Sequence, residues 1–241
     1  MNYIIDFKPI VINDIDEEKI SEIEYKITNN IFISKEEVKY LLDYVIYLTR
    51  YKINSNLDNY ENKCDLAQSM LYYYFKELNC NIYPCMTQNV ITNNIIGHSF
   101  LIINLLVNNQ KVNYLVDPTY IQFFTKEKCS DNKYFINHNP PYNILITPDP
   151  GYFIKKEDIQ LIKDLINKGY ETLTEDIARI YGDSFYNTKT GESDKNFKSI
   201  SGNIYINAFL KGKENISKTI IELEENNLII APIYKDKKRI K

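Results

Sequence analysis

Three residues whose types suit nucleophilic catalysis occur in order between positions 62 and 123. Cys64 begins an apolar segment with helical spacing, His98 opens an apolar strand-like segment, and Asp117 closes the next one. A thiol, an imidazole and a carboxylate in this arrangement suit a nucleophile, its base and the group that orients the base. The sequence therefore predicts a thiol-dependent acyl transfer centred on these three residues.

Cys64 is expected in the first turn of its helix. Free backbone N–H groups and the helix dipole at that position stabilise a thiolate and can receive a developing oxyanion. The neighbouring Asp65 opposes a thiolate unless its carboxylate points away. Taken by itself, Cys64 is better explained as a buried structural cysteine, which is the commonest fate of a free cysteine.

His98 immediately precedes the run SFLIINLLV, which is apolar enough to form a central strand. We expect His98 just before this strand, at the sheet's edge and facing a helix N-terminus. The asparagines at 108–109 predict a tight hairpin turn, which brings Asp117 near the level of His98. A carboxylate there holds the imidazole in the tautomer that accepts the thiol proton. The alternatives are a surface histidine and an Asp-Pro pair that simply starts a turn.

Apolar residues at helical spacing predict two strong helices before His98. The first spans 34–51 and opens with the S-x-x-E capping box of Ser34 and Glu37. The second spans 64–78, and we expect Asn62 to cap it. Because this helix carries Cys64, its start decides where the nucleophile lies.

The remaining elements are predicted from the alternation of apolar and polar residues, from helix-capping residues and from turn residues. Strands are expected at 3–7, 82–90, 98–107, 111–116, 142–146, 204–210 and 228–234, and further helices at 156–168 and 175–181. A short helix or turn is expected at 17–27, and a helix or strand between the last two strands. This order indicates an α+β fold rather than a doubly wound sheet, with the nucleophile helix packed on an antiparallel sheet. We expect one domain over 1–241, made of an N-terminal segment (1–33), a catalytic core (34–150) and C-terminal helices with closing strands (151–241).

Composition excludes several function classes. With 29 basic and 32 acidic residues the net charge is −3, so no bulk field favours nucleic acid or an anionic membrane. The N-terminus lacks the pattern of a signal peptide, and no window approaches a membrane span. We expect a cytoplasmic protein, or an effector-like protein secreted without a standard signal. The oligomeric state stays open.

The central motifs resemble the transglutaminase-like branch of the papain-like superfamily. The chain has a cysteine at a helix start, G-H-x-F before an apolar strand, and V-D-P-T-Y at the end of the next strand. The run D-P-T-Y-x-Q-F is most similar to bacterial members, including effector glutamine deamidases and cysteine proteases. The resemblance covers roughly 35–150. It implies a papain-like core, with Cys64 as nucleophile, His98 as general base and acid, and Asp117 as orienter. It also implies a protein or peptide substrate and no cofactor or metal.

The sequence departs from that family in two ways. Papain-like proteases carry an oxyanion glutamine shortly before the cysteine. In the corresponding stretch this chain offers only Asn54, Asn56, Asn59, Tyr60 and Asn62, and Asn59 and Gln122 are the candidates that remain. Animal transglutaminases use a tryptophan beside the site, and this chain has none. The residues do not choose between hydrolysis, as in a protease or deamidase, and transamidation. The resemblance favours hydrolysis.

Two other readings compete with an acyl-transfer enzyme. Cys80 and Cys85, joined by Cys64, His98 or Cys129, suggest a zinc site, although a C-x4-C pair is at the loose edge of zinc spacing. The chain can also be a catalytically silent papain-like binding module. The second histidine, His138, lies in a turn-rich loop and is not assigned to catalysis.

Overall fold

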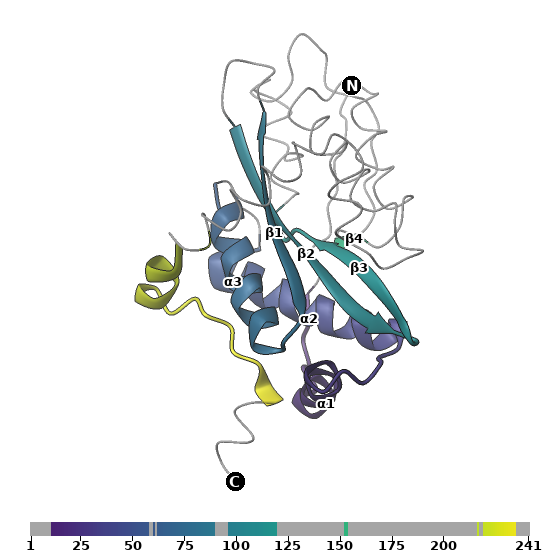
Figure 1. Cartoon of the computed structure of the whole chain (residues 1–241). Helices are drawn as coiled ribbons and strands as arrows, with labels where there is room; N and C mark the ends of the chain where they lie inside the picture. The colour runs from purple at the N-terminus through teal and green to yellow at the C-terminus, as the bar shows by residue number, and fades with distance from the viewer. Residues whose placement is uncertain are drawn as a thin grey trace, which may run out of the picture.

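The computed structural model in Figure 1 describes residues 11–57, 60, 62–89, 96–119, 152–153, 216 and 219–234. These residues form helices and an antiparallel sheet with strand order β1-β2-β3-β4. The elements are α1 (Glu17–Thr28), α2 (Lys35–Ile53), α3 (Cys64–Glu77), β1 (Asn81–Asn89), β2 (Ile96–Val107), β3 (Gln110–Val116) and β4 (Tyr152–Phe153). The fold is therefore mixed α+β, as the sequence predicts. None of the described helices is long and apolar enough to cross a membrane.

Helices α1 and α2 begin where side chains satisfy their first backbone N–H groups. The Asp16 carboxylate accepts from the Lys19 N–H at 3.0 Å. At the start of α2, Ser34 Oγ accepts from the Glu37 N–H at 3.1 Å, and Glu37 Oε2 accepts from the Ser34 N–H at 2.7 Å. The predicted capping box is confirmed, and so is the predicted start of α2.

The start of α3 differs from the prediction in its cap. The N-cap residue is Lys63, which makes no side-chain capping hydrogen bond, so the expected cap at Asn62 is wrong. Asn62 instead adopts a left-handed backbone (φ 58°), which asparagine tolerates better than most residues, and turns the chain into the helix. Asn79 has φ 59° and follows the helix end, as predicted.

Helix α3 is fastened to the sheet by a buried glutamine. Gln68 is 1% exposed, and its Nε2 donates to the carbonyl oxygens of Cys85 and Phe100, both at 2.6 Å. Cys85 and Phe100 are register partners in the pairing of β1 with β2. One amide group therefore holds α3 against two adjacent strands.

Strand β2 begins earlier than predicted. It starts at Ile96, so His98 lies inside the strand, paired with Thr87 of β1, and not just before it. The reason is that β1 continues far enough to pair with the residues that precede His98. The tight turn between β2 and β3 is confirmed, because Asn108 and Asn109 have φ 49° and 64°.

The hydrophobic core lies between the helices and one face of the sheet (Figure 1). Alternate residues of β2 point into it, together with Tyr114 and Val116 of β3. Tyr74 is fully buried, and its hydroxyl donates to Glu24 Oε1 at 2.6 Å. Tyr72 and Tyr73 are only partly buried, so the three consecutive tyrosines serve packing as predicted.

The C-terminal segment 219–234 packs beside α3 and α1, but not as a strand (Figure 1). Residues 219–225 are helical, whereas the predicted strand at 228–234 is wrong: 228–232 have no regular structure. The Tyr234 N–H donates to the buried carboxylate of Glu24 at 2.7 Å. The backbone of Tyr234 therefore hydrogen-bonds to a side chain and not to a neighbouring strand. Strand β4 was not predicted.

Several predicted elements fall outside the described residues. They are the strands at 3–7, 142–146 and 204–210 and the helices at 156–168 and 175–181.

Replacing Gln68 by methionine tests the attachment of α3. The side chain keeps its approximate volume but leaves two buried carbonyl groups without their donor, so we expect a loss of roughly 2–4 kcal/mol in unfolding free energy. Urea denaturation followed by circular dichroism measures it. The control is Lys76→Met on the exposed side of the same helix, with an expected change within about 0.5 kcal/mol. Equal midpoints for both variants would contradict the proposed attachment.

Candidate active site

His98 and Asp117 form a buried pair at the end of the β2–β3 ladder. The His98 Nε2 and Asp117 Oδ2 atoms are 2.5 Å apart, and both side chains are fully buried. The last paired residues of the ladder are Leu101 and Val116, so the pair lies just beyond it. Residue counting placed the two near one level, and the structure brings their side chains into contact.

The second carboxylate oxygen of Asp117 is also engaged. Asp117 Oδ1 accepts from the N–H of Thr119 at 3.1 Å and from its hydroxyl at 3.2 Å. These bonds close a turn over Pro118 in the way that aspartate commonly does. The carboxylate is therefore held from both sides, and so is the imidazole that contacts it.

A buried arginine supports the same turn from α2. Arg50 is fully buried and its Nε donates to the Pro118 carbonyl at 2.7 Å. Its guanidinium also lies 5.8 Å from the ring centroid of Tyr60, which precedes α3 and is 2% exposed. Arg50 thus contacts both the turn that carries Asp117 and the segment that leads to Cys64.

Sequence reasoning missed Arg50, Gln68 and Ser99. For Arg50 a signal was present, because it comes four residues after Ile46 on the apolar face of α2, where an arginine needs a buried partner. Gln68 likewise falls among the apolar positions of α3. Nothing in the sequence pattern singles out Ser99.

Cys64 is the first residue of α3 and is half-buried. It lies near His98 and helps to raise the pKa of that histidine, after the larger effects of burial, which lowers the pKa, and of Asp117, which raises it. Since Nε2 of the ring faces Asp117, Nδ1 is the ring nitrogen on the side opposite that carboxylate. The thiol therefore lies near an imidazole that is itself in contact with a carboxylate.

The imidazole is tuned toward its protonated form. Burial lowers the pKa of His98, but the charge and hydrogen bond of Asp117, together with Cys64, outweigh burial and raise that pKa from 6.5 to about 10. A protonated histidine beside a thiol is the partner that a thiolate needs.

Asp65 does not point away from the nucleophile. Cys64 Sγ lies 3.9 Å from Asp65 Oδ1, and that oxygen accepts the Ser99 hydroxyl at 2.5 Å. The Asp65 carbonyl also accepts from Ser69 Oγ at 2.9 Å. The Asp65 carboxylate, whose charge opposes a thiolate, therefore lies beside the thiol. Its hydrogen bond to Ser99, the residue after His98, links it to β2.

The other two described cysteines, Cys80 and Cys85, lie in less reactive surroundings. Burial raises the pKa of Cys80 to about 12 and the pKa of Cys85 further still. Among the residues that the structure describes, no group of three or more His, Cys, Asp or Glu side chains is placed to hold a metal ion. Cys129, which the zinc reading also used, lies outside the described residues.

Both proposed oxyanion residues, Asn59 and Gln122, lie outside the described residues, as does His138. Of the described groups, the N–H groups at the start of α3 are the donors available beside Cys64.

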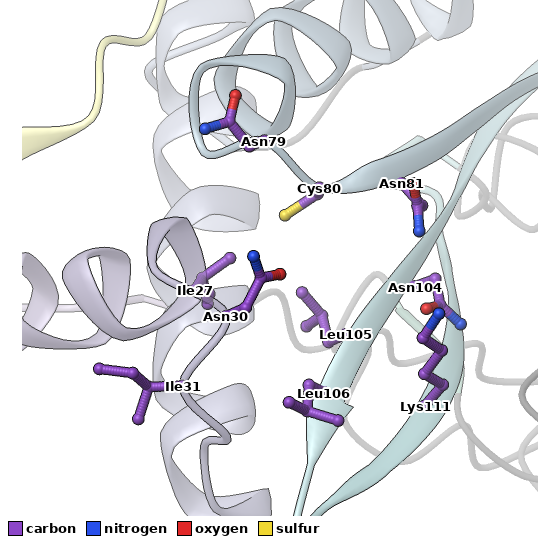
Figure 2. Close-up of a pocket in the computed structure, with 10 residues that line it drawn as sticks. All are labelled: Ile27, Asn30, Ile31, Asn79, Cys80, Asn81, Asn104, Leu105, Leu106 and Lys111. Atoms are coloured by element: carbon purple, nitrogen blue, oxygen red, sulfur yellow. The ribbon is translucent and has the colours of Figure 1, made fainter.

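Figure 2 shows a pocket of about 130 Å³ at the other end of the sheet. Its polar lining consists of Asn30, Asn79, Asn81, Asn104, Lys111 and Cys80. Asn104 is six residues from His98 along β2, a separation of about 20 Å. Asn30 and Asn79 have positive φ angles of 56° and 59°, so turn geometry accounts for two of the asparagines. The pocket shares no residue with the Cys64 site.

The arrangement at Cys64 can carry out nucleophilic attack with proton transfer and requires no bound group to do so. No family model matches the chain, and no curated protein or solved structure matches it either.

Proposed function

We propose that the chain is a thiol-dependent acyl-transfer enzyme that acts on an amide bond of a protein or peptide. Its nucleophile is Cys64, its base and acid is His98, and its orienting carboxylate is Asp117. The main support is the buried contact of 2.5 Å between His98 Nε2 and Asp117 Oδ2, with Cys64, at the start of α3, near enough to the same histidine to help raise its pKa. We further propose that the core is papain-like, on the basis of the motif order and of α3 packing on an antiparallel sheet.

The reaction begins with the thiol and imidazole sharing one proton. The sulfur of Cys64 attacks the carbonyl carbon of a carboxamide or peptide bond, and the N–H groups at the start of α3 face the oxygen as it becomes negative. His98, protonated, gives its proton to the departing amine, and a thioester remains on Cys64. Asp117 keeps the imidazole oriented and stabilises its charge through both steps.

A second nucleophile resolves the thioester. Water, deprotonated by His98, gives a carboxylic acid and restores the thiol, which is the outcome of a protease or glutamine deamidase. An amine in place of water gives a new amide, which is transamidation. We propose hydrolysis, because the motifs resemble deamidases and proteases most. Transamidation is the alternative within the same mechanism.

A catalytically silent binding module is the alternative from a different class. In such a module the burial of Arg50 and Asp117 would need a reason other than catalysis, because buried charges are costly unless they are paired. Fold specificity alone is one such reason. The reactivity of Cys64 therefore has to decide between enzyme and module.

Iodoacetamide labelling, followed by peptide mass spectrometry, measures that reactivity. We expect Cys64 to be labelled at least about tenfold faster than Cys80 and Cys85 at pH 7, because burial raises the pKa of those two thiols. His98→Gln, which keeps a polar group beside Asp117, should slow Cys64 labelling by about tenfold or more. Equal, slow labelling of Cys64, Cys80 and Cys85, unchanged in His98→Gln, would favour the binding module.

Stability should depend on pH through His98. Its folded-state pKa is raised from 6.5 to about 10, so its contribution is fully present below pH 6.5 and is lost as the pH rises toward 10. We therefore expect the difference in unfolding free energy between wild type and His98→Gln to shrink between pH 6.5 and 10. Urea titrations at three pH values measure this difference in unfolding free energy. Titrating groups that both proteins share contribute equally to the two values and cancel. A difference that stays constant over this range would contradict the raised pKa.

A further inference from the structure

A fixed negative charge stands beside the nucleophile. The Asp65 carboxylate is half-buried, and its Oδ1 lies 3.9 Å from Cys64 Sγ. Asp65 is not needed for proton transfer, which His98 and Asp117 already serve. A carboxylate also disfavours a neighbouring thiolate, so its position calls for a different explanation.

The structure holds this carboxylate in place. Ser99 is 1% exposed, and its hydroxyl donates to Asp65 Oδ1 at 2.5 Å. The backbone of Asp65 is held as well, because the fully buried Ser69 donates to its carbonyl at 2.9 Å. Since both partners are buried, the carboxylate cannot turn away from the sulfur without giving up a buried hydrogen bond.

The other charges near Cys64 do not cancel this one. His98 is positive when protonated, but the buried Asp117 carboxylate offsets its charge at 2.5 Å. Lys63, one residue before the cysteine, is exposed to solvent, where its charge is screened. Among the charged side chains described on α3, β2 and the β3 end, Asp65 is therefore the one near the sulfur whose charge no neighbouring side chain offsets.

We propose that Asp65 is a specificity-determining residue, which makes the site accept neutral or positively charged substrate segments and reject acidic ones at the attacked carbonyl. A charge held within 4 Å of the sulfur acts on any charged group that reaches the sulfur, because the attraction or repulsion falls only slowly with distance. The proposal rests on the proposed function, since it describes the substrates of the same nucleophile.

A pair of charged thiol reagents tests the proposal. Cationic and anionic methanethiosulfonates, carrying a trimethylammonium and a sulfonate group, react by the same step: the Cys64 sulfur attacks the reagent sulfur, a disulfide forms, and methanesulfinate leaves with the electron pair of the broken bond. Peptide mass spectrometry gives the rate at Cys64. The ratio of the two rates cancels the intrinsic reactivity of the thiol and reports the local charge.

We expect the cationic reagent to be favoured in wild type and Asp65→Asn to lower the ratio about five- to tenfold. The asparagine keeps an oxygen that can accept the Ser99 hydroxyl. The control is Glu36→Gln, an exposed acidic residue in the first turn of α2, which should leave the ratio unchanged. In wild type, raising the salt concentration should lower the ratio even if Asp65→Asn fails to fold.

The outcomes separate this inference from the proposed function. A ratio that is equal in wild type and Asp65→Asn, or one that is insensitive to salt in wild type, would overturn the role of Asp65 while leaving the nucleophile intact. Loss of the preferential, His98-dependent labelling of Cys64 would instead overturn the proposed function.

Discussion

The buried pair of His98 and Asp117 is the constraint on which the site depends. Two ionisable groups without solvent are costly to fold unless each is fully partnered, and here the aspartate is bonded to both the histidine and Thr119. The turn that presents it is held in addition by Arg50, which is itself buried. Polar groups therefore occupy this end of the sheet, although apolar side chains in the same positions would cost less free energy to bury.

Three separate attachments bring the remaining groups to this pair. Gln68 fixes α3 across β1 and β2, Ser99 ties the first turn of α3 to the residue after His98, and Arg50 links α2 to the Asp117 turn. Each one is a polar side chain at a position that faces inward. Because a nucleophile and its base must be held to within about 0.5 Å, such rigid supports suit catalysis.

Much of the described fold could be predicted from the sequence, because its signals are local. The capping box at Ser34, the turn at 108–109 and the apolar periodicity of α3 each depend on neighbouring residues only. The start of β2 was missed because it depends on how far β1 continues beside it. The strand predicted at 228–234 failed for a related reason: Glu24, distant in sequence, binds the backbone of Tyr234. Cys64, His98 and Asp117 could be named from residue type and order, whereas their supports depend on long-range contacts that no local pattern reveals.

The central claim is that Cys64 carries out acyl transfer on protein amides. It is tested most directly by mass spectrometry of proteins from a candidate host lysate after incubation with wild type or with Cys64→Ala. A gain of about one mass unit at glutamine, new peptide termini, or amine-tagged glutamine, seen with wild type only, is the expected result; the three products correspond to deamidation, proteolysis and transamidation. Identical product sets from the two proteins across lysates would contradict the account and leave a binding module in its place.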